Sequence, residues 1–306
     1  DMPGERKEGM DHPHYEWSPI STRPKLTWPE GKTLAVCVLV SLNHMEWEPP
    51  EGAFQAHNLA GGLGRRPRID YARLTHREYG HRVGLYRVLD VLEKHGIPVN
   101  LAMDGLTAEH YPYIVAHCRE RGVEFVAHGM SVSRMITSRM SDTDEREYIQ
   151  TTLDTMEKHT GTRPTGWFGP EHGESMRTPA LLADCGLDHV DDWVNDEQPY
   201  PMTTPTGELY SLPLMLELDD VNALWDRNVV LGRYERLLVE SAEVMARDGE
   251  DNARLLVLHI HPWLMGQPFR IATLDRALAG MHAQPGAVFT TGTHVVDWTR
   301  RARGTG

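Results

Sequence analysis

The chain has 306 residues, of which 40% are hydrophobic and 25% are charged. These values are ordinary for a globular protein, and no apolar run approaches the roughly 18 residues needed to span a bilayer. The formal net charge of −13 would repel a phosphate backbone or an anionic membrane, which excludes nucleic acid and membrane as the main partners. We therefore expect a soluble protein that acts on a small molecule.

The N-terminal 32 residues are punctuated by prolines and predict an extended arm that lies on the domain. A single domain is expected over 33–306. It opens with an almost continuous apolar run at 33–42, typical of a buried central strand. The long loop that follows, 47–70, contains several glycines, and we expect it to overhang the site.

After this loop, helical spacing and stop signals alternate with short apolar strands. Further strands are predicted at 98–103, 123–127, 166–168, 189–192, 209–214, 255–259 and 287–290. Helices are predicted at 79–95, 107–121, 142–159, 178–185, 233–247 and 273–282, with a last helix through Trp298. Repeated βα units predict a parallel sheet with helical cover. A dinucleotide fold would carry GxGxxG after the first strand, and 41–47 has none, so an α/β barrel is preferred.

Three widely spaced cysteines, Cys37, Cys118 and Cys185, form no CxxC pattern. Such a set suggests neither a disulfide framework nor a structural zinc site. The N-terminal stretch also lacks the apolar segment of a secretory signal. Together these features predict a cytoplasmic location.

Carboxylates, imidazoles and indoles follow five of the predicted strands. Active sites of parallel α/β folds lie at the carboxyl ends of the strands, so we expect these side chains to share one rim. They include Asn43, His44, Glu46, His128, Glu171, His172, Asp192, Trp193, Asn195, His259, His261 and Trp263. His259 and His261 are one strand period apart and point to the same side. Asp191 and Asp192 point to opposite faces, so only one of them can enter the site.

These groups suit hydrolysis of a carbonyl compound, which needs a base for water, a polariser for the carbonyl oxygen and an acid for the leaving nitrogen. Neutral imidazoles and a carboxylate would also suit zinc or a similar ion. Each residue has a structural interpretation as well. A single histidine is often a partly buried, hydrogen-bonded residue, and Trp193 and Trp263 are core aromatics as readily as walls for a flat ring.

From about Trp28 to Trp298, the order of the strand ends resembles the five motifs of the polysaccharide deacetylase superfamily. Within it, the chain is most similar to the allantoinase and cyclic-imidase branch. The stretches that carry the resemblance are YGHRVG at 79–84, AHG at 127–129, DWVNDEQP at 192–199 and HPWLMGQPFRI at 261–271. The resemblance implies a distorted (β/α)7 barrel of the polysaccharide deacetylase type and a homo-oligomer, either a dimer or a tetramer.

The resemblance also implies an altered site. The family's first motif falls on 41–44, so its base carboxylate becomes Asn43 and its metal-ligating carboxylate becomes His44. The second motif, His-x-x-x-His, begins at His128 and ends at Val132, which removes the second metal-binding imidazole. The usual zinc triad is thus missing, and we expect either no cofactor or one divalent, zinc-like ion. The family's general acid matches His261.

We expect Glu46 or Asp192 to act as the base and His261 as the acid, while Glu171 is a further carboxylate that could replace the lost one. His44 and His128 would hold the substrate carbonyl or the metal ion. The substrate-binding candidates are Asn43, Glu171, Trp193, Asn195, His259 and Trp263.

The leading hypothesis is hydrolysis of a non-peptide C–N bond in a small cyclic amide, imide or ureide. A metal-dependent N-deacetylase of an oligosaccharide is the alternative, against which Asn43 and Val132 argue. A third possibility, from a different class, is a ligand-binding relative that has lost the reaction. Asn43 favours that interpretation, whereas the retained His128 and His261 oppose it.

Overall fold

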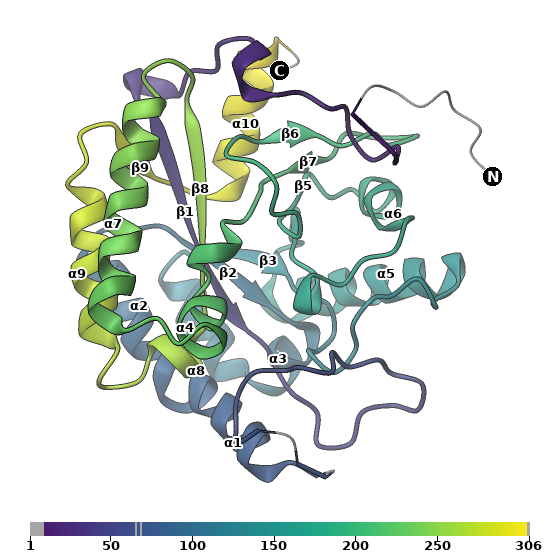
Figure 1. Cartoon of the computed structure of the whole chain (residues 1–306). Helices are drawn as coiled ribbons and strands as arrows, with labels where there is room; N and C mark the ends of the chain where they lie inside the picture. Colours follow the sequence, from purple (N-terminus) through teal and green to yellow (C-terminus); the bar gives the residue numbers. More distant parts are fainter. Residues whose placement is uncertain (1–8, 65, 68, 305–306) are drawn as a thin grey trace.

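A computed structural model of the chain describes residues 9–64, 66–67 and 69–304. They fold around one curved sheet with helices packed on its outside (Figure 1). The strand order is β6-β7-β5-β4-β3-β2-β1-β8, with β9 also paired to β1. The strands are β1 (Leu34–Leu42), β2 (Val99–Met103), β3 (Glu124–Ala127), β4 (Gly166–Trp167), β5 (His189–Val190), β6 (Tyr200–Pro201), β7 (Tyr210–Ser211), β8 (Arg254–Ile260) and β9 (Ala287–Phe289).

The sheet curls until its two ends meet. All pairings are parallel except the one between β6 and β7. A parallel bridge between Leu214 and Val257 joins the segment after β7 to β8, and β8 pairs in turn with β1. The strands β1, β2, β3, β4, β5, β7 and β8 therefore run round a distorted barrel, and the predicted (β/α)7 fold is confirmed.

Ten α-helices connect the strands within the described residues: α1 (Tyr71–Tyr79), α2 (Leu85–Lys94), α3 (Gly105–His110), α4 (Pro112–Glu120), α5 (Asp142–Thr160), α6 (Thr178–Asp184), α7 (Leu231–Asp248), α8 (Pro262–Met265), α9 (Ile271–His282) and α10 (Gly292–Arg303). Two expected helices differ from the prediction. The helix expected at 79–95 begins at Tyr71, because the Asp70 side chain caps it by accepting from the Arg73 N–H. The helix expected at 107–121 is split where Pro112 starts a new one.

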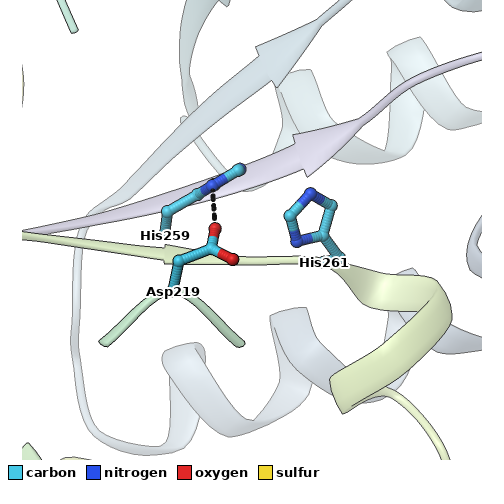
Figure 2. A group of neighbouring side chains, drawn as sticks. All are labelled: Asp219, His259 and His261. Carbon is cyan, nitrogen blue, oxygen red and sulfur yellow. Dashed lines mark ion pairs between the residues drawn. The ribbon is translucent and has the colours of Figure 1, made fainter. Parts of the chain in front are cut away.

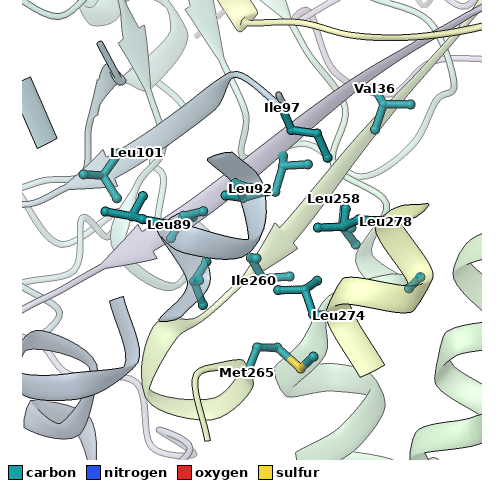
Figure 3. Packing of buried hydrophobic residues seen from close by; sticks show 14 of the residues in the cluster. Val36, Leu89, Leu92, Ile97, Leu101, Leu258, Ile260, Met265, Leu274 and Leu278 are labelled. Atoms are coloured by element: carbon teal, nitrogen blue, oxygen red, sulfur yellow. The ribbon is translucent and has the colours of Figure 1, made fainter. Parts of the chain in front are cut away.

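Side chains along β1 alternate between two hydrophobic clusters, one between the sheet and the helices and one inside the barrel. Val36, Val38 and Val40 face outward and pack with residues of α2, α7 and α9, and Figure 3 shows the aliphatic side chains of this outer layer between strand and helices. Cys37 and Leu39 face into the barrel with side chains of β8 and the segment after β7. Burial of each large aliphatic side chain contributes about 1.5–3 kcal/mol. All nine residues of β1 are buried, as expected for a central strand covered on both faces.

A π-helical turn at Gly80–Gly84 links α1 to α2 and lies against the start of α8. A Cβ on Gly84 would lie 2.0 Å from the Pro262 carbonyl oxygen, and one on Gly80 would lie 3.0 Å from the Trp263 nitrogen. Only glycine permits such close backbone approach. Two of the stretches that carry the family resemblance thus pack directly on each other, and their contact fixes the backbone just after His261.

The described part of the arm, residues 9–32, contains two short 3-10 turns, Ile20–Thr22 and Pro29–Gly31. It is tied to the domain by the Trp28 indole, which donates to the Arg254 carbonyl at 2.7 Å, and by the Thr203 N–H, which donates to the His14 carbonyl at 2.7 Å. No helix in the described ranges has the length and apolarity needed to cross a membrane.

Candidate functional site

The polar side chains that follow the strands do gather at one end of the barrel. His261 follows β8, His128 follows β3, Asn43 follows β1 and Asp192 follows β5. Their exposed fractions are 6%, 2%, 6% and 7%, respectively. The expected shared rim is present, and its groups are almost enclosed by protein.

His261 is held by a carboxylate that the sequence did not reveal. Asp220 accepts from the His261 backbone N–H at 2.8 Å and contacts its Nδ1 at 2.7 Å. The Nδ1 proton is therefore directed at Asp220, which leaves Nε2 as the free nitrogen. Burial lowers the pKa of His261 to about 4, so the imidazole is neutral at pH 7. Burial and the neighbouring Asp219 raise the pKa of Asp220, whereas its two N–H donors favour the ionised form.

A second carboxylate–imidazole pair lies beside the first. Figure 2 shows His259 on β8 and His261 just after the end of this strand, with Asp219 joined to His259. The contact from Asp219 Oδ2 to His259 Nδ1 is 2.5 Å, and His259 Nε2 lies 2.6 Å from the Ser41 hydroxyl. Burial acts to raise the pKa of Asp219, but the charge of His259 and their contact hold it below the ordinary value. The two histidine rings are 4.3 Å apart, which agrees with the prediction that they point to the same side.

His128 stacks on Phe168 with ring centroids 4.9 Å apart. Its Nδ1 donates to the Phe168 carbonyl at 2.5 Å, and its Nε2 lies 3.4 Å from the Asn43 amide nitrogen. Burial lowers the pKa of His128 to about 3. His128 is thus a neutral imidazole that accepts from Asn43, and the second amide N–H of Asn43 remains available as a donor.

Glu46 is engaged by neighbours from the segment after β3. Arg134 donates to its two oxygens at 2.9 and 2.6 Å, and the Ser131 hydroxyl donates at 2.5 Å. Burial acts to raise the pKa of Glu46, but these hydrogen bonds hold it below the ordinary value. A carboxylate stabilised in this way is a weak proton acceptor.

Asp192, unlike Glu46, has a raised affinity for protons. Burial raises its pKa to about 6, although Oδ1 accepts from the Gly169 N–H at 2.7 Å. Burial and the charge of Asp192 also raise the pKa of Glu174, so the two carboxyl groups compete for protons. Asp191 contacts His189 at 3.0 Å instead, as expected if only one of the adjacent aspartates enters the site.

Glu171 and His172 form a strained turn after β4. Both have positive φ, 54° and 56°, which is uncommon for residues other than glycine and is often found at functional sites. Glu171 Oε1 lies 3.8 Å from Nη2 of the buried Arg77, and His172 Nδ1 donates to the Asp192 carbonyl at 3.0 Å. The turn therefore connects the site to α1.

Two predicted substrate-binding residues border the N-terminal arm. The Asn195 amide donates to the Tyr15 hydroxyl at 2.9 Å and accepts from the Tyr200 hydroxyl at 2.8 Å. Trp193 packs against His14 and Tyr15. The arm thus covers this side of the rim, and Asn195 has an evident role in holding it. Trp263, in contrast, is buried beside His261.

His44 and His128 have different neighbours. The rings around His44 are those of His81, His110 and Tyr111, and the His44 backbone N–H donates to Asp104 at 2.5 Å. Burial lowers the pKa of His44.

As the resemblance implies, the family's usual zinc triad does not fit these positions. Val132 is completely buried and offers no donor, and Asn43 directs its amide nitrogen at His128. Among the described residues, Asp219, His259 and His261 are the group with donor atoms close together, all within 4.8 Å. An aspartate and two histidines are ligands that zinc accepts. However, Asp219 and His259 contact each other directly, so this group could hold an ion only if that pair opened.

Sequence reasoning missed Asp219, Asp220 and Glu174. The two aspartates lie in the irregular segment between β7 and α7, where no periodic pattern marks a strand end. The one signal in the sequence was that two aspartates stand next to each other in an apolar stretch. Carboxylates in such a stretch are seldom buried unless they have partners, so this pair could have been suspected of binding other site residues.

Comparisons with known proteins agree with this architecture. Residues 78–190 match the family model for polysaccharide deacetylase. A Schizosaccharomyces pombe protein named as a polysaccharide deacetylase is 23% identical over 312 residues, which cover 92% of this chain and 94% of the relative. The crystal structure of a probable polysaccharide deacetylase from Pseudomonas aeruginosa PAO1 has a TM-score of 0.80 and 20% identity, and covers 91% of this chain and 95% of its own. The crystal structure of Puue allantoinase has a TM-score of 0.78 and 21% identity, with coverage of 92% and 95%. Residues 78–190 thus match the polysaccharide deacetylase model, and most of the chain is similar to a protein named as a polysaccharide deacetylase and, in fold, to solved deacetylase and allantoinase structures.

Proposed function

We propose that the protein opens a small cyclic amide, imide or ureide by hydrolysis, and that it does so without the family's zinc ion. The observation that carries the proposal is the Asp220–His261 pair, with a neutral imidazole whose Nε2 is free. The similarity to an allantoinase structure supports the same class of substrate.

His261 first acts as a base. Its Nε2 removes a proton from water while the oxygen attacks the ring carbonyl, and Asp220 stabilises the imidazolium that forms. The imidazolium then gives the same proton to the ring nitrogen as the C–N bond breaks. One water is consumed, and the products are a carboxyl group and an amine or amide on one open chain. His261 thus acts as the expected general acid in the second step, after it has acted as the base in the first.

Asn43 supplies the polarising donor. Where the resemblance implies a carboxylate base, this chain has an amide with one N–H directed at His128. Its remaining N–H can donate to the carbonyl oxygen as negative charge develops there. Asp192 is the favoured second proton acceptor, because Glu46 is engaged by Arg134.

The burial of the site favours a small ring over a polymer. His128, His261 and Asp192 are each less than a tenth exposed, and the arm packs against Trp193 at the rim. An oligosaccharide N-deacetylase would need a groove that leaves its acid and base accessible along a chain. The missing imidazole at Val132 also argues against zinc-dependent deacetylation.

The test is turnover of hydantoin, succinimide, allantoin and dihydrouracil by purified protein, beside acetate release from an N-acetylated chito-oligosaccharide. We expect ring opening with at least one cyclic compound, unchanged after dialysis against a chelator and with metal content well below one ion per chain. Acetate release that requires added zinc would support the deacetylase instead. Binding of rings without turnover by freshly purified protein would indicate a ligand-binding relative.

A further inference from the structure

Arg77, in the last turn of α1, is a charged group at the site for which the proposed reaction has no use. Only 3% of the residue is exposed, and its Cζ lies over the Trp263 ring, 5.3 Å from the centroid. Nε donates to the Ala60 carbonyl at 3.4 Å. Nη1 has no hydrogen-bond partner among the described residues, and Nη2 is 3.8 Å from Glu171. A buried cation with one distant carboxylate is unfavourable unless an anion completes its contacts.

The surroundings of Arg77 are rich in donors and in positive charge. The indole nitrogen of Trp263 is also buried without an acceptor in the described structure. Burial lowers the pKa of Arg77, and the nearby Arg73 adds to this effect. Burial also lowers the pKa of His76, with a smaller contribution from Arg270, and the His76 ring contacts Trp263. Arg73 already has a carboxylate neighbour in Asp70, 3.8 Å away. The donors of Arg77 and Trp263 that lack an acceptor among the described residues are therefore the groups that would hold an anion in a chain with a net charge of −13.

We infer that Arg77 and the Trp263 indole N–H bind a carboxylate on the substrate, so that the natural substrate is a cyclic amide or ureide bearing an acidic side group. The inference rests on the proposed ring-opening function. The planar guanidinium suits a carboxylate, which it can hold by two parallel hydrogen bonds. The Trp263 ring lies 6.2 Å from the His261 ring, so an acid group held here would orient the substrate ring toward the reacting imidazole. Glu171 competes for the same cation.

A matched pair of rings tests this inference. Hydantoin-5-acetic acid and 5-methylhydantoin differ in the carboxylate, and calorimetry measures their binding whether or not they are opened. We expect the wild-type protein to bind the acid about 10- to 100-fold more tightly, the range for one charge-assisted contact. Arg77→Met should abolish the difference and Arg77→Lys should retain part of it, mainly through KM. Arg233→Met, at an exposed position on α7, is the control and should change neither affinity.

Glu171→Gln gives a result of opposite sign. Because it removes the competing carboxylate, it should tighten binding of the acid relative to the methyl compound, whereas structural damage would weaken binding of both. If a thermal melt shows that Arg77→Met is unfolded, the Glu171→Gln variant still tests the inference. Equal binding of the two rings by wild type, or equal loss of both in Arg77→Met, would overturn the inference. Tight binding of the acid without turnover would support the inference and contradict the proposed function.

Discussion

Replacement of Asp220 by asparagine tests the carboxylate–imidazole pair directly. The carboxylate accepts two N–H donors from His261, at 2.8 Å and 2.7 Å. An amide keeps the shape but offers only one oxygen, so one donor would face its NH₂ group. The Nδ1 proton then loses its preferred acceptor, and the tautomer with the proton on Nε2 becomes populated. That tautomer cannot take a proton from water.

The expected loss in kcat is about 10²- to 10⁴-fold, the range for removing general acid–base assistance or for selecting the wrong tautomer. KM should change much less, since Asp220 contacts His261 and not the ring. The assay is initial-rate hydrolysis of the best cyclic substrate, with circular dichroism to confirm folding. Asp251→Asn, at an exposed position, is the matched control. A folded Asp220→Asn protein with kcat within threefold of wild type would falsify the proposed role.

Three further predictions concern stability and the loop after β1. Burial holds the pKa of His81 and His128 at about 3 in the folded state, against 6.5 for the free side chain. As the pH falls, these histidines therefore take up protons in the unfolded chain before they do so in the folded protein. Each should remove about 2 kcal/mol from the free energy of unfolding between pH 7 and pH 5. Urea titrations across this range measure the loss, and a flat profile would contradict the buried neutral state. Gly84→Ala should lower both Tm and kcat, because its methyl group would clash with the Pro262 carbonyl. Gly232→Ala is the control, since Gly232 has open space around it, and it should leave both values unchanged. Thermal melts and rate assays measure the two effects. Glu46→Gln should destabilise the loop held by Arg134, measured as faster proteolysis, without removing an acidic limb from the pH–rate profile; loss of that limb would restore Glu46 as the base.

The strand pattern was readable because burial on both faces demands apolar, β-branched runs, and β1 is such a run along its whole length. Helix limits were less readable. The start of α1 depends on the Asp70 cap inside what looks like a glycine-rich loop, and Pro112 divides a pattern that is otherwise continuous.

The site could be located from the sequence, but the partners of its members could not. Strand ends converge in any parallel barrel, so His128, Asp192 and His261 could be placed at one rim. The lowered pKa of Glu46 depends on Arg134, 88 residues away. The tautomer of His261 depends on Asp220, 41 residues away in an irregular segment. Such pairings are set by tertiary packing, and no local spacing encodes them.

The position of β1 has a consequence for how the chain is made. It is the first strand of the barrel, yet it pairs with β8 and β9, which lie more than 200 residues later. At 5–20 residues per second, the ribosome would need roughly 10–40 s to supply β8 after β1 has emerged. During that interval, an apolar strand has an open edge that can pair with another nascent chain. The yield of folded protein should therefore depend on chaperones and on growth temperature. This dependence should be stronger than expected from the stability of the finished barrel.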